Sequence, residues 1–328
     1  MVLILSNKWD ISVDFIVREL RKRGEKFVRI NTEDLPYSDC SVSLPDFSFL
    51  LPHGEQVTEL VGNLKSVLFR RPGKPFEETE PADLSSKPVL RYSTEQWHAF
   101  IEGLLSINDV LWINHPRAND LMECKIVQLR KAVEMGFRIP RTCITSSKDK
   151  AEKFIESCGG CVVAKSIYSS LIEYSDKDFF VFTTVVKSLK DVPPPEFGIA
   201  PVIFQEYIDG GKIDYRVTVI GEKVYAVRIE FTEGNPGVVD WRTKKDGLMF
   251  IPCELPSDLR KKCIDFVSQC GLVFGAIDFV QVRDDFYFLE INPNGEWGWL
   301  QRRANLPIAE AITEYLVAGN RGYTKCMG

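Results

Sequence analysis

The pattern of apolar and polar positions near the N-terminus predicts a strand, a helix and a second strand. Residues 1–6 (MVLILS) form a short apolar run, as expected for a buried strand. Residues 9–24 predict a helix that Gly24 ends, with apolar side chains on one face at Val13, Ile16, Val17 and Leu20. A strand follows over 26–36, and this order predicts a parallel sheet with a right-handed crossover. No glycine-rich phosphate turn joins the first strand to its helix, so the pattern does not favour dinucleotide binding.

The rest of the chain continues to alternate between the two periodicities. Helices are expected over 94–106, 121–136 and 257–271. Strands are expected over 111–113, 160–166, 178–186, 201–208, 214–221, 223–231, 274–282 and 285–292. A proline-broken loop after 111–113 and the prolines of 191–198 indicate boundaries, because clustered prolines continue neither a helix nor a central strand. We therefore expect domains at 1–115, 116–190 and 191–328.

The last two predicted strands carry oxygen-bearing side chains at matching positions. Glu290 and Asn292 lie two residues apart, so both point to one face of their strand. A three-residue turn at 283–285 would place Asp278 opposite Glu290, whereas a two-residue turn would need a bulge to do so. Two carboxylates and one amide oxygen suit Mg²⁺, which keeps waters and takes other oxygens from nucleotide phosphates. The alternative is that these groups only satisfy the end of a hairpin.

Cations upstream are candidates to meet those phosphates. Lys165, Arg216 and Arg228 all lie on predicted strands, where a charge is costly unless an anion meets it. Each one alone is more often salt-bridged, but with the hairpin they indicate a clamp on a transferring phosphoryl group. The strand at 203–208 also offers an extended backbone edge that suits adenine.

Composition narrows the class of protein. The chain has 328 residues, of which 45% are apolar, and its net charge is −5. No apolar run is long enough for a membrane span, no secretion signal is present, and the acidic balance argues against nucleic acid as the main ligand. The cytoplasm is the default location. Nine cysteines include the pair Cys158 and Cys161, which suggests either a redox or zinc pair or, as we favour, reduced thiols.

The order of these motifs resembles the ATP-grasp superfamily, and its general layout is similar to ribosomal-protein glutamate ligases. The resemblance is closer to the graspetide synthetases, which cyclise microviridin-type precursor peptides. It covers nearly the whole chain and is carried by Lys125, Lys165 and the strings INTEDLP, FRRP, VFTT, QEYI, DYRV, AVR, DWR, LEINPNGEWGWL and LPIAEAI. It implies an α/β ATP-grasp fold, with an N-terminal βαβ domain and two α+β lobes that clamp ATP.

The resemblance also implies roles for individual residues. ATP would be bound by Lys125, Lys165, Gln205, Glu206, Tyr207, Ile208 and Asp214, the hinge residues acting largely through backbone. The γ-phosphate and acyl-phosphate would be surrounded by Arg216, Arg228 and Arg242. Mg²⁺ would be held by Asp278, Glu290 and Asn292, with Asn294 near the same mouth. The chain departs from many ATP-grasp proteins in having no glycine after Lys165, where Ser169 and Ser170 would contact phosphate instead.

The implied reaction is ATP-dependent peptide cyclisation. An Asp or Glu of a ribosomal precursor peptide would become an acyl-phosphate, and a Ser, Thr or Lys of the same peptide would close an ester or amide ring. Two alternatives stay open: ligation of an amino acid or small amine, and nucleotide-dependent peptide binding without turnover. Trp241, Trp297 and Trp299 would either line a peptide groove or belong to the core. The resemblance also suggests a homodimer.

Overall fold

The computed structural model describes residues 1–53, 56–76, 87–107, 109–168, 171–173, 178–190, 197–233, 239–244 and 246–320. The chain forms two compact units. Unit 1 comprises 1–118, 271–274 and the residues from 296 onward, and unit 2 comprises 119–270 and 275–295. These units differ from the three domains expected from sequence, chiefly because the segment after 295 joins the N-terminal residues. The three-part division stays a prediction.

Unit 1 is built on a parallel sheet of four strands in the order β2-β1-β6-β7. The predicted strand-helix-strand start is confirmed as β1 (Val2–Ser6), α1 (Ile11–Lys22) and β2 (Phe27–Asn31). A 3₁₀ turn at Thr32–Tyr37 replaces the end of the predicted second strand. The other strands of the sheet are β6 (Ser66–Phe69) and β7 (Leu111–Ile113). An antiparallel meander that the sequence did not indicate comprises β3 (Ser41–Ser43), β4 (Ser48–His53) and β5 (Gln56–Glu59).

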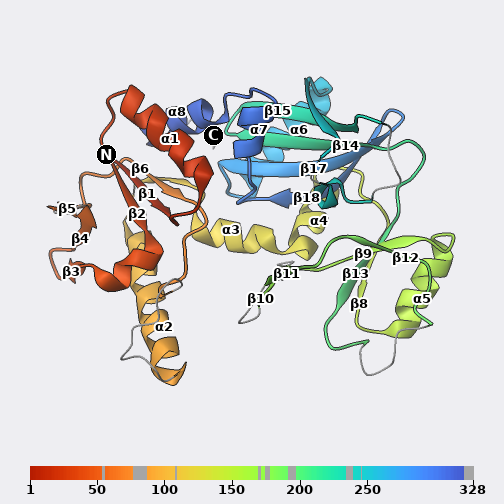
Figure 1. The fold of residues 1–328 in the computed structure, drawn as a ribbon, viewed down its shortest axis with the longest axis horizontal. Helices are drawn as coiled ribbons and strands as arrows, with labels where there is room; N and C mark the ends of the chain where they lie inside the picture. Colours follow the sequence, from red (N-terminus) through yellow and green to blue (C-terminus); the bar gives the residue numbers. More distant parts are fainter. Residues whose placement is uncertain are drawn as a thin grey trace. The chain divides into compact units, whose positions relative to one another are not determined.

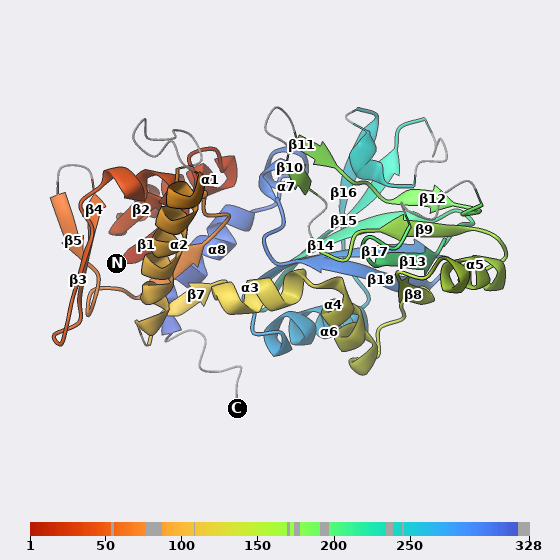
Figure 2. The same ribbon diagram turned by 90° about the horizontal axis from the view of Figure 1, so that it is seen from below.

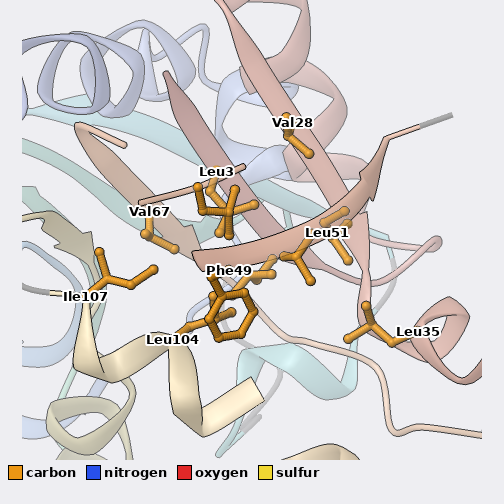
Figure 3. Packing of buried hydrophobic residues seen from close by; sticks show 11 residues of the cluster. Leu3, Val28, Leu35, Phe49, Leu51, Val67, Leu104 and Ile107 are labelled. Carbon is orange, nitrogen blue, oxygen red and sulfur yellow. The ribbon is translucent and has the colours of Figure 1, made fainter. Parts of the chain in front are cut away.

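Helices cover both faces of this sheet (Figures 1 and 2). On one face lies α2 (Lys87–Gly103), continued by a 3₁₀ turn at Leu104–Ser106. Figure 3 shows the apolar core on that side, where Leu3, Phe49 and Val67 point toward one another. On the opposite face α1 packs against α8 (Ile308–Ala318), which follows the short helix α7 (Gly298–Arg303). Successive strand residues alternate between the two cores, which accounts for the uninterrupted apolar run of β1.

A helical segment leads from unit 1 into unit 2, and it differs from its prediction. Residue Pro116, expected in a loop, is the first residue of α3 (Pro116–Glu123), a position where proline's missing N–H costs nothing. The predicted single helix up to Gly136 is divided at Cys124, whose backbone is extended, with ψ 108°. Beyond it lies α4 (Lys125–Glu134).

Unit 2 contains two larger antiparallel sheets and a two-stranded ribbon. The first sheet, in the order β12-β9-β13-β8, packs against α5 (Lys148–Ser157) and consists of β8 (Thr142–Thr145), β9 (Val162–Lys165), β12 (Thr184–Val186) and β13 (Val202–Glu206). The ribbon pairs β10 (Leu171–Glu173) with β11 (Asp178–Phe180). The single strand expected over 178–186 is therefore two strands, because its halves pair with different partners, β10 and β9.

The second sheet of unit 2 has five strands in the order β16-β15-β14-β17-β18. They are β14 (Ile213–Ile220), β15 (Lys223–Phe231), β16 (Leu248–Cys253), β17 (Phe274–Val282) and β18 (Asp285–Asn292). The helix α6 (Ser257–Gln269) covers one face, where Phe266 contacts Phe137 and Phe288. Among the described residues, no helix has the length and apolar character needed to cross a membrane.

Candidate active site

The hairpin of β17 and β18 brings Asp278 and Glu290 directly opposite each other, as the candidate metal site requires. The turn has two residues, because Val282 pairs with Asp285, so the first of the two solutions that the sequence allowed, a three-residue turn, is excluded. The register is corrected by a β-bulge, in which Asp278 pairs with Glu290 but the next residue pairs with Phe288. Leu289 is therefore the extra residue. The bulge was the second of the two solutions that the sequence allowed.

Both carboxylates are buried and each is paired with an arginine. Arg216 Nη1 lies 2.9 Å from Asp278 Oδ1, and Arg242 Nη1 lies 3.3 Å from Glu290 Oε1. Asn292 Nδ2 donates to Asp278 Oδ2 at 3.3 Å, so the three candidate metal ligands are contiguous. Hard oxygen donors on one strand face are the set that Mg²⁺ prefers, so these residues fit the ion.

The last glycine of the LEINPNG string is required by this packing. A Cβ on Gly295 would lie 2.6 Å from Arg216 Nη2 and 2.6 Å from the Cβ of Ala276. Any larger residue would have to displace the arginine that contacts Asp278.

The two carboxylates have opposite pKa shifts. Burial raises the pKa of Asp278, and the neighbouring Arg216 only partly offsets that effect. Burial would also raise the pKa of Glu290, but the positive charges of Arg242, Lys125 and Lys165 outweigh it and lower the pKa to about 2. Glu290 is thus the carboxylate around which the cations of the site are arranged.

Arg242 is fixed by a residue that sequence reasoning did not single out. Asp240 accepts from Arg242 Nε and Nη2, both at 2.8 Å, and its carboxylate also caps the short 3₁₀ turn at Trp241–Thr243. These contacts raise the pKa of the guanidinium against the effect of burial. The sequence signal for this role is the string DWR, in which Asp240 lies two residues before Arg242. A fork-to-carboxylate contact holds one orientation of the arginine and leaves Nη1 for Glu290.

Lys165 lies at the end of β9 and is partly buried. Its Nζ donates to Gln205 Oε1 at 2.9 Å, and Gln205 Nε2 donates in turn to Thr142 Oγ1. Burial lowers the pKa of Lys165, with the charge of Glu290 acting in the opposite direction. An anion placed beside this ammonium group would relieve that cost. Lys125, the first residue of α4, lies 3.8 Å from Glu290 Oε2.

An open cavity within unit 2 is lined by Lys165, Arg242, Asp278 and Glu290. Strands of both larger sheets line it, together with Tyr207 and Ile208 directly after β13. Its charged lining residues are Lys165, Glu206, Lys212, Asp214, Asp240, Arg242, Asp278 and Glu290. Burial raises the pKa of Asp214, and Lys212 Nζ, 3.5 Å away, partly offsets this. Trp241 also lines this cavity, whereas Trp297 is fully buried in the core of unit 1.

Two candidate residues lie elsewhere. Arg228 pairs with Tyr215 across β14 and β15, and residues paired in this way share a face, so Arg228 is on the face opposite to Arg216. Its guanidinium contacts Glu230 at 3.2 Å. Because side chains alternate between the two faces of a strand, the expectation that Arg228 joins Arg216 and Arg242 at the site is not met. Asn294 accepts from Asn119 and donates to Glu123.

The remaining predicted features are two serines, a linker and a pair of cysteines. Ser169 and Ser170, and most of the predicted linker at 191–198, lie outside the described residues. The eight described cysteines, including Cys158 and Cys161, are free thiols. Within the described ranges, no group of three or more His, Cys, Asp and Glu residues has the geometry of a metal site.

Comparisons with known proteins agree on one fold. A family model described as a RimK-like ATP-grasp domain matches residues 118–316. A RiPP-associated ATP-grasp ligase of Chryseobacterium gregarium, solved with ADP and a leader and core peptide, is 26% identical with a TM-score of 0.84 and coverage of 96% of each chain. The macrocyclase MdnC of Microcystis aeruginosa MRC, solved with the precursor peptide MdnA, is 24% identical with a TM-score of 0.82, covering 97% of this chain and 99% of that one. A probable alpha-L-glutamate ligase 2 of Hahella chejuensis is 24% identical over 66% of this chain and 68% of its own length.

Proposed function

Because the chain belongs to the RimK-like ATP-grasp family and is an ATP-grasp ligase, we propose that it uses ATP and Mg²⁺ to close ester or amide rings in a ribosomally made precursor peptide. The cavity of unit 2 supports the ATP part of this proposal, since its lining includes a partly buried lysine, an arginine held by a carboxylate and two acidic side chains. The peptide part is supported by the likeness to the C. gregarium ligase, which extends over 96% of both chains and thus includes unit 1.

We assign the residues as follows. The extended backbone at Glu206, Tyr207 and Ile208 would bind adenine, with Gln205 orienting Lys165 toward phosphate. Asp278, Glu290 and Asn292 would hold Mg²⁺, which supplies neutralisation of phosphate charge when bound. Arg216 and Arg242, now paired with those carboxylates, would turn to the transferring phosphoryl group.

The chemistry requires no nucleophile from the enzyme. A peptide carboxylate oxygen attacks the γ-phosphorus of ATP, ADP leaves, and an acyl-phosphate forms. A hydroxyl or amine of the same peptide then attacks the acyl carbon, loses its proton and displaces phosphate, so each ring costs the peptide one water. This chain would contribute positioning and fixed charge, which are the main sources of rate in phosphoryl transfer.

Intact mass spectrometry tests the proposal. The short peptide rich in acidic and hydroxyl residues that is encoded nearest to this gene is incubated with the protein, ATP and Mg²⁺, and ADP is quantified in parallel. We expect loss of one water per ADP, abolished in Asp278→Ala and retained in Arg228→Gln, a matched change on the other face of the same sheet. An unchanged peptide mass with intact ATP binding would refute the cyclase proposal.

Amino-acid ligation is the second candidate, favoured by the glutamate-ligase name of the H. chejuensis relative. It would use the same acyl-phosphate and differ only in the acceptor. The same spectrum separates the two functions, because ligation adds mass to the peptide. A homodimer and a cytoplasmic location stay predictions.

A further inference from the structure

Unit 1 contains a second open cavity, with a volume of about 550 Å³, to which the proposed ATP chemistry assigns no role. Three parts of the chain line it: the loop from β1 into the first turns of α1, Arg71 of the FRRP string, and α7 together with Glu296 before it. Its principal side chains are Trp9, Phe15, Arg71, Trp299, Arg302 and Arg303. Several of these lie in the strings FRRP and EWGWL, which the nucleotide site does not use.

Residues of the strings INTEDLP and FRRPG form hydrogen bonds that hold the loop between β1 and α1 in place. Glu33 Oε1 accepts from the backbone N–H of Lys8 at 2.7 Å, and Thr32 Oγ1 donates to the carbonyl of Gly73 at 2.6 Å. A Cβ on Gly73 would lie 2.5 Å from Glu33 Oε2, so only glycine allows this approach. Two loops that are distant in sequence are thereby fixed at the rim of the cavity.

The backbone conformation of Arg71 and a hydrogen bond to its carbonyl fix the position of this residue at the cavity. Its φ is +46°, a conformation that non-glycine residues rarely adopt, and its carbonyl accepts from Asn7 Nδ2 at 2.6 Å. Asn7 Oδ1 accepts in turn from the backbone N–H of Trp9 at 2.8 Å. The Trp9 side chain is 79% exposed, which is unusual for a tryptophan in a hydrogen-bonded loop.

Arginines outnumber carboxylates among the described residues that line the cavity. Buried Arg70 contacts both carboxylates, Asp10 Oδ2 at 2.9 Å and Glu296 Oε2 at 3.0 Å. Arg71 shares Glu296 at 3.2 Å, and α7 adds Arg302 and Arg303. Among the described residues that line the cavity there are thus three arginines and two carboxylates, and both carboxylates also contact Arg70.

Aromatic rings complete the lining. The Arg302 guanidinium lies 5.3 Å from the centre of the Phe15 ring, and Trp299 is oriented by a hydrogen bond from Nε1 to the Glu296 carbonyl at 3.2 Å. Tryptophan and arginine are enriched among the residues that contribute most to affinity at protein–protein interfaces. Together these features suit a ligand with carboxylates next to apolar side chains.

We propose that this cavity binds an acidic segment of the peptide substrate, with its carboxylates on Arg71, Arg302 and Arg303 and its apolar side chains on Trp9 and Trp299. This inference rests on the proposed function for the identity of the peptide. The size favours a peptide over a free amino acid, because a volume of about 550 Å³ lies within the range of roughly 300–1,000 Å³ of pockets that hold whole drug-sized ligands.

Fluorescence anisotropy tests the proposal without turnover. The probe is a fluorescein-labelled synthetic peptide rich in Asp and Glu with one Phe, and its counterpart carries Asn and Gln instead. The protein variant is Arg302→Gln with Arg303→Gln, both exposed positions, and the control is Arg91→Gln on the exposed face of α2. We expect the double variant to bind the acidic peptide on the order of tenfold more weakly, and the control to match the parent protein.

Three results would overturn the inference: equal binding by parent and double variant, equal binding of the Asn/Gln peptide, or full displacement by an equal concentration of free glutamate. The outcome of this binding test can be distinguished from the outcome of the cyclisation test. Arginine-dependent binding of the probe, together with an unchanged mass of the peptide encoded nearest to this gene, would refute the proposed function and keep the cavity. Normal cyclisation with unchanged binding in the double variant would refute the cavity and keep the function.

Discussion

Replacing Glu290 with glutamine should destabilise the nucleotide-free protein, whereas replacing the opposite residue, Asp278, with asparagine should not. The two side chains are paired on one strand face and are both buried, so the comparison changes charge with little change in size. What differs is their electrostatic surroundings. Glu290 is surrounded by Arg242, Lys125 and Lys165, whereas the burial cost of Asp278 exceeds its attraction to Arg216.

The magnitude follows from the pKa of Glu290. A carboxyl whose pKa falls from 4.5 to about 2 on folding contributes stability above pH 4.5 and loses it as the pH falls through about 2. At about 1.4 kcal/mol per unit, the contribution is about 3 kcal/mol at neutral pH. The sign is opposite for Asp278, because a raised pKa means that its ionised form opposes folding. We expect Asp278→Asn to leave stability unchanged or higher.

Urea unfolding followed by tryptophan fluorescence measures both changes, without nucleotide or Mg²⁺. The difference between the parent protein and Glu290→Gln should be full at neutral pH and narrow below pH 4.5, where the parent carboxylate begins to protonate in the unfolded chain. Both variants should lose ligase activity. If Asp278→Asn costs as much stability as Glu290→Gln, or if Glu290→Gln costs nothing, the electrostatic reasoning is refuted.

Three further predictions concern neighbouring residues. Lys165→Met should preserve stability in a thermal melt, because burial lowers the pKa of this lysine, but should weaken ATP binding at least about tenfold in a titration. Arg242→Gln should reduce turnover about 100-fold, whereas Arg228→Gln, on the other face beside Glu230, should stay within about twofold; equal losses would contradict the assignment of faces. Asp240→Ala should lower kcat about tenfold by releasing Arg242, with partial recovery in Asp240→Asn; an unchanged kcat would show that the carboxylate does not position the arginine.

Much of the fold followed from the sequence because local patterns determine it. The strands with alternating or continuous apolar residues and the helix ended by Gly24 were found within a few residues of their observed bounds. The errors fall where partners distant in sequence decide the outcome. The run at 178–186 is divided because its halves pair with different strands. Pro116 is a local exception, because proline suits the first turn of a helix as well as a loop.

For the candidate site, too, some residues could be predicted from the sequence and others could not. Residues that carry charge on apolar strands, such as Lys165 and Arg216, stand out because their burial is costly without a partner. Asp240 was missed because its role depends on a contact with Arg242 that ordinary turn residues also make. Arg228 was misplaced because a run of residues on a strand does not show which of its two faces meets the ligand.

The bulge at Leu289 separates the length of the hairpin tip from the placement of Glu290. Inserting a single residue at the tip, between Arg283 and Asp284, would lengthen the turn to three residues and leave Asp278 paired with Glu290 if the bulge stayed. Deleting Leu289 would remove the bulge and leave four paired residues on each strand between this pair and the two-residue turn, so Glu290 would still lie opposite Asp278. The pairing should therefore survive either change, and ligase activity after deletion of Leu289 would show whether the bulge itself is needed.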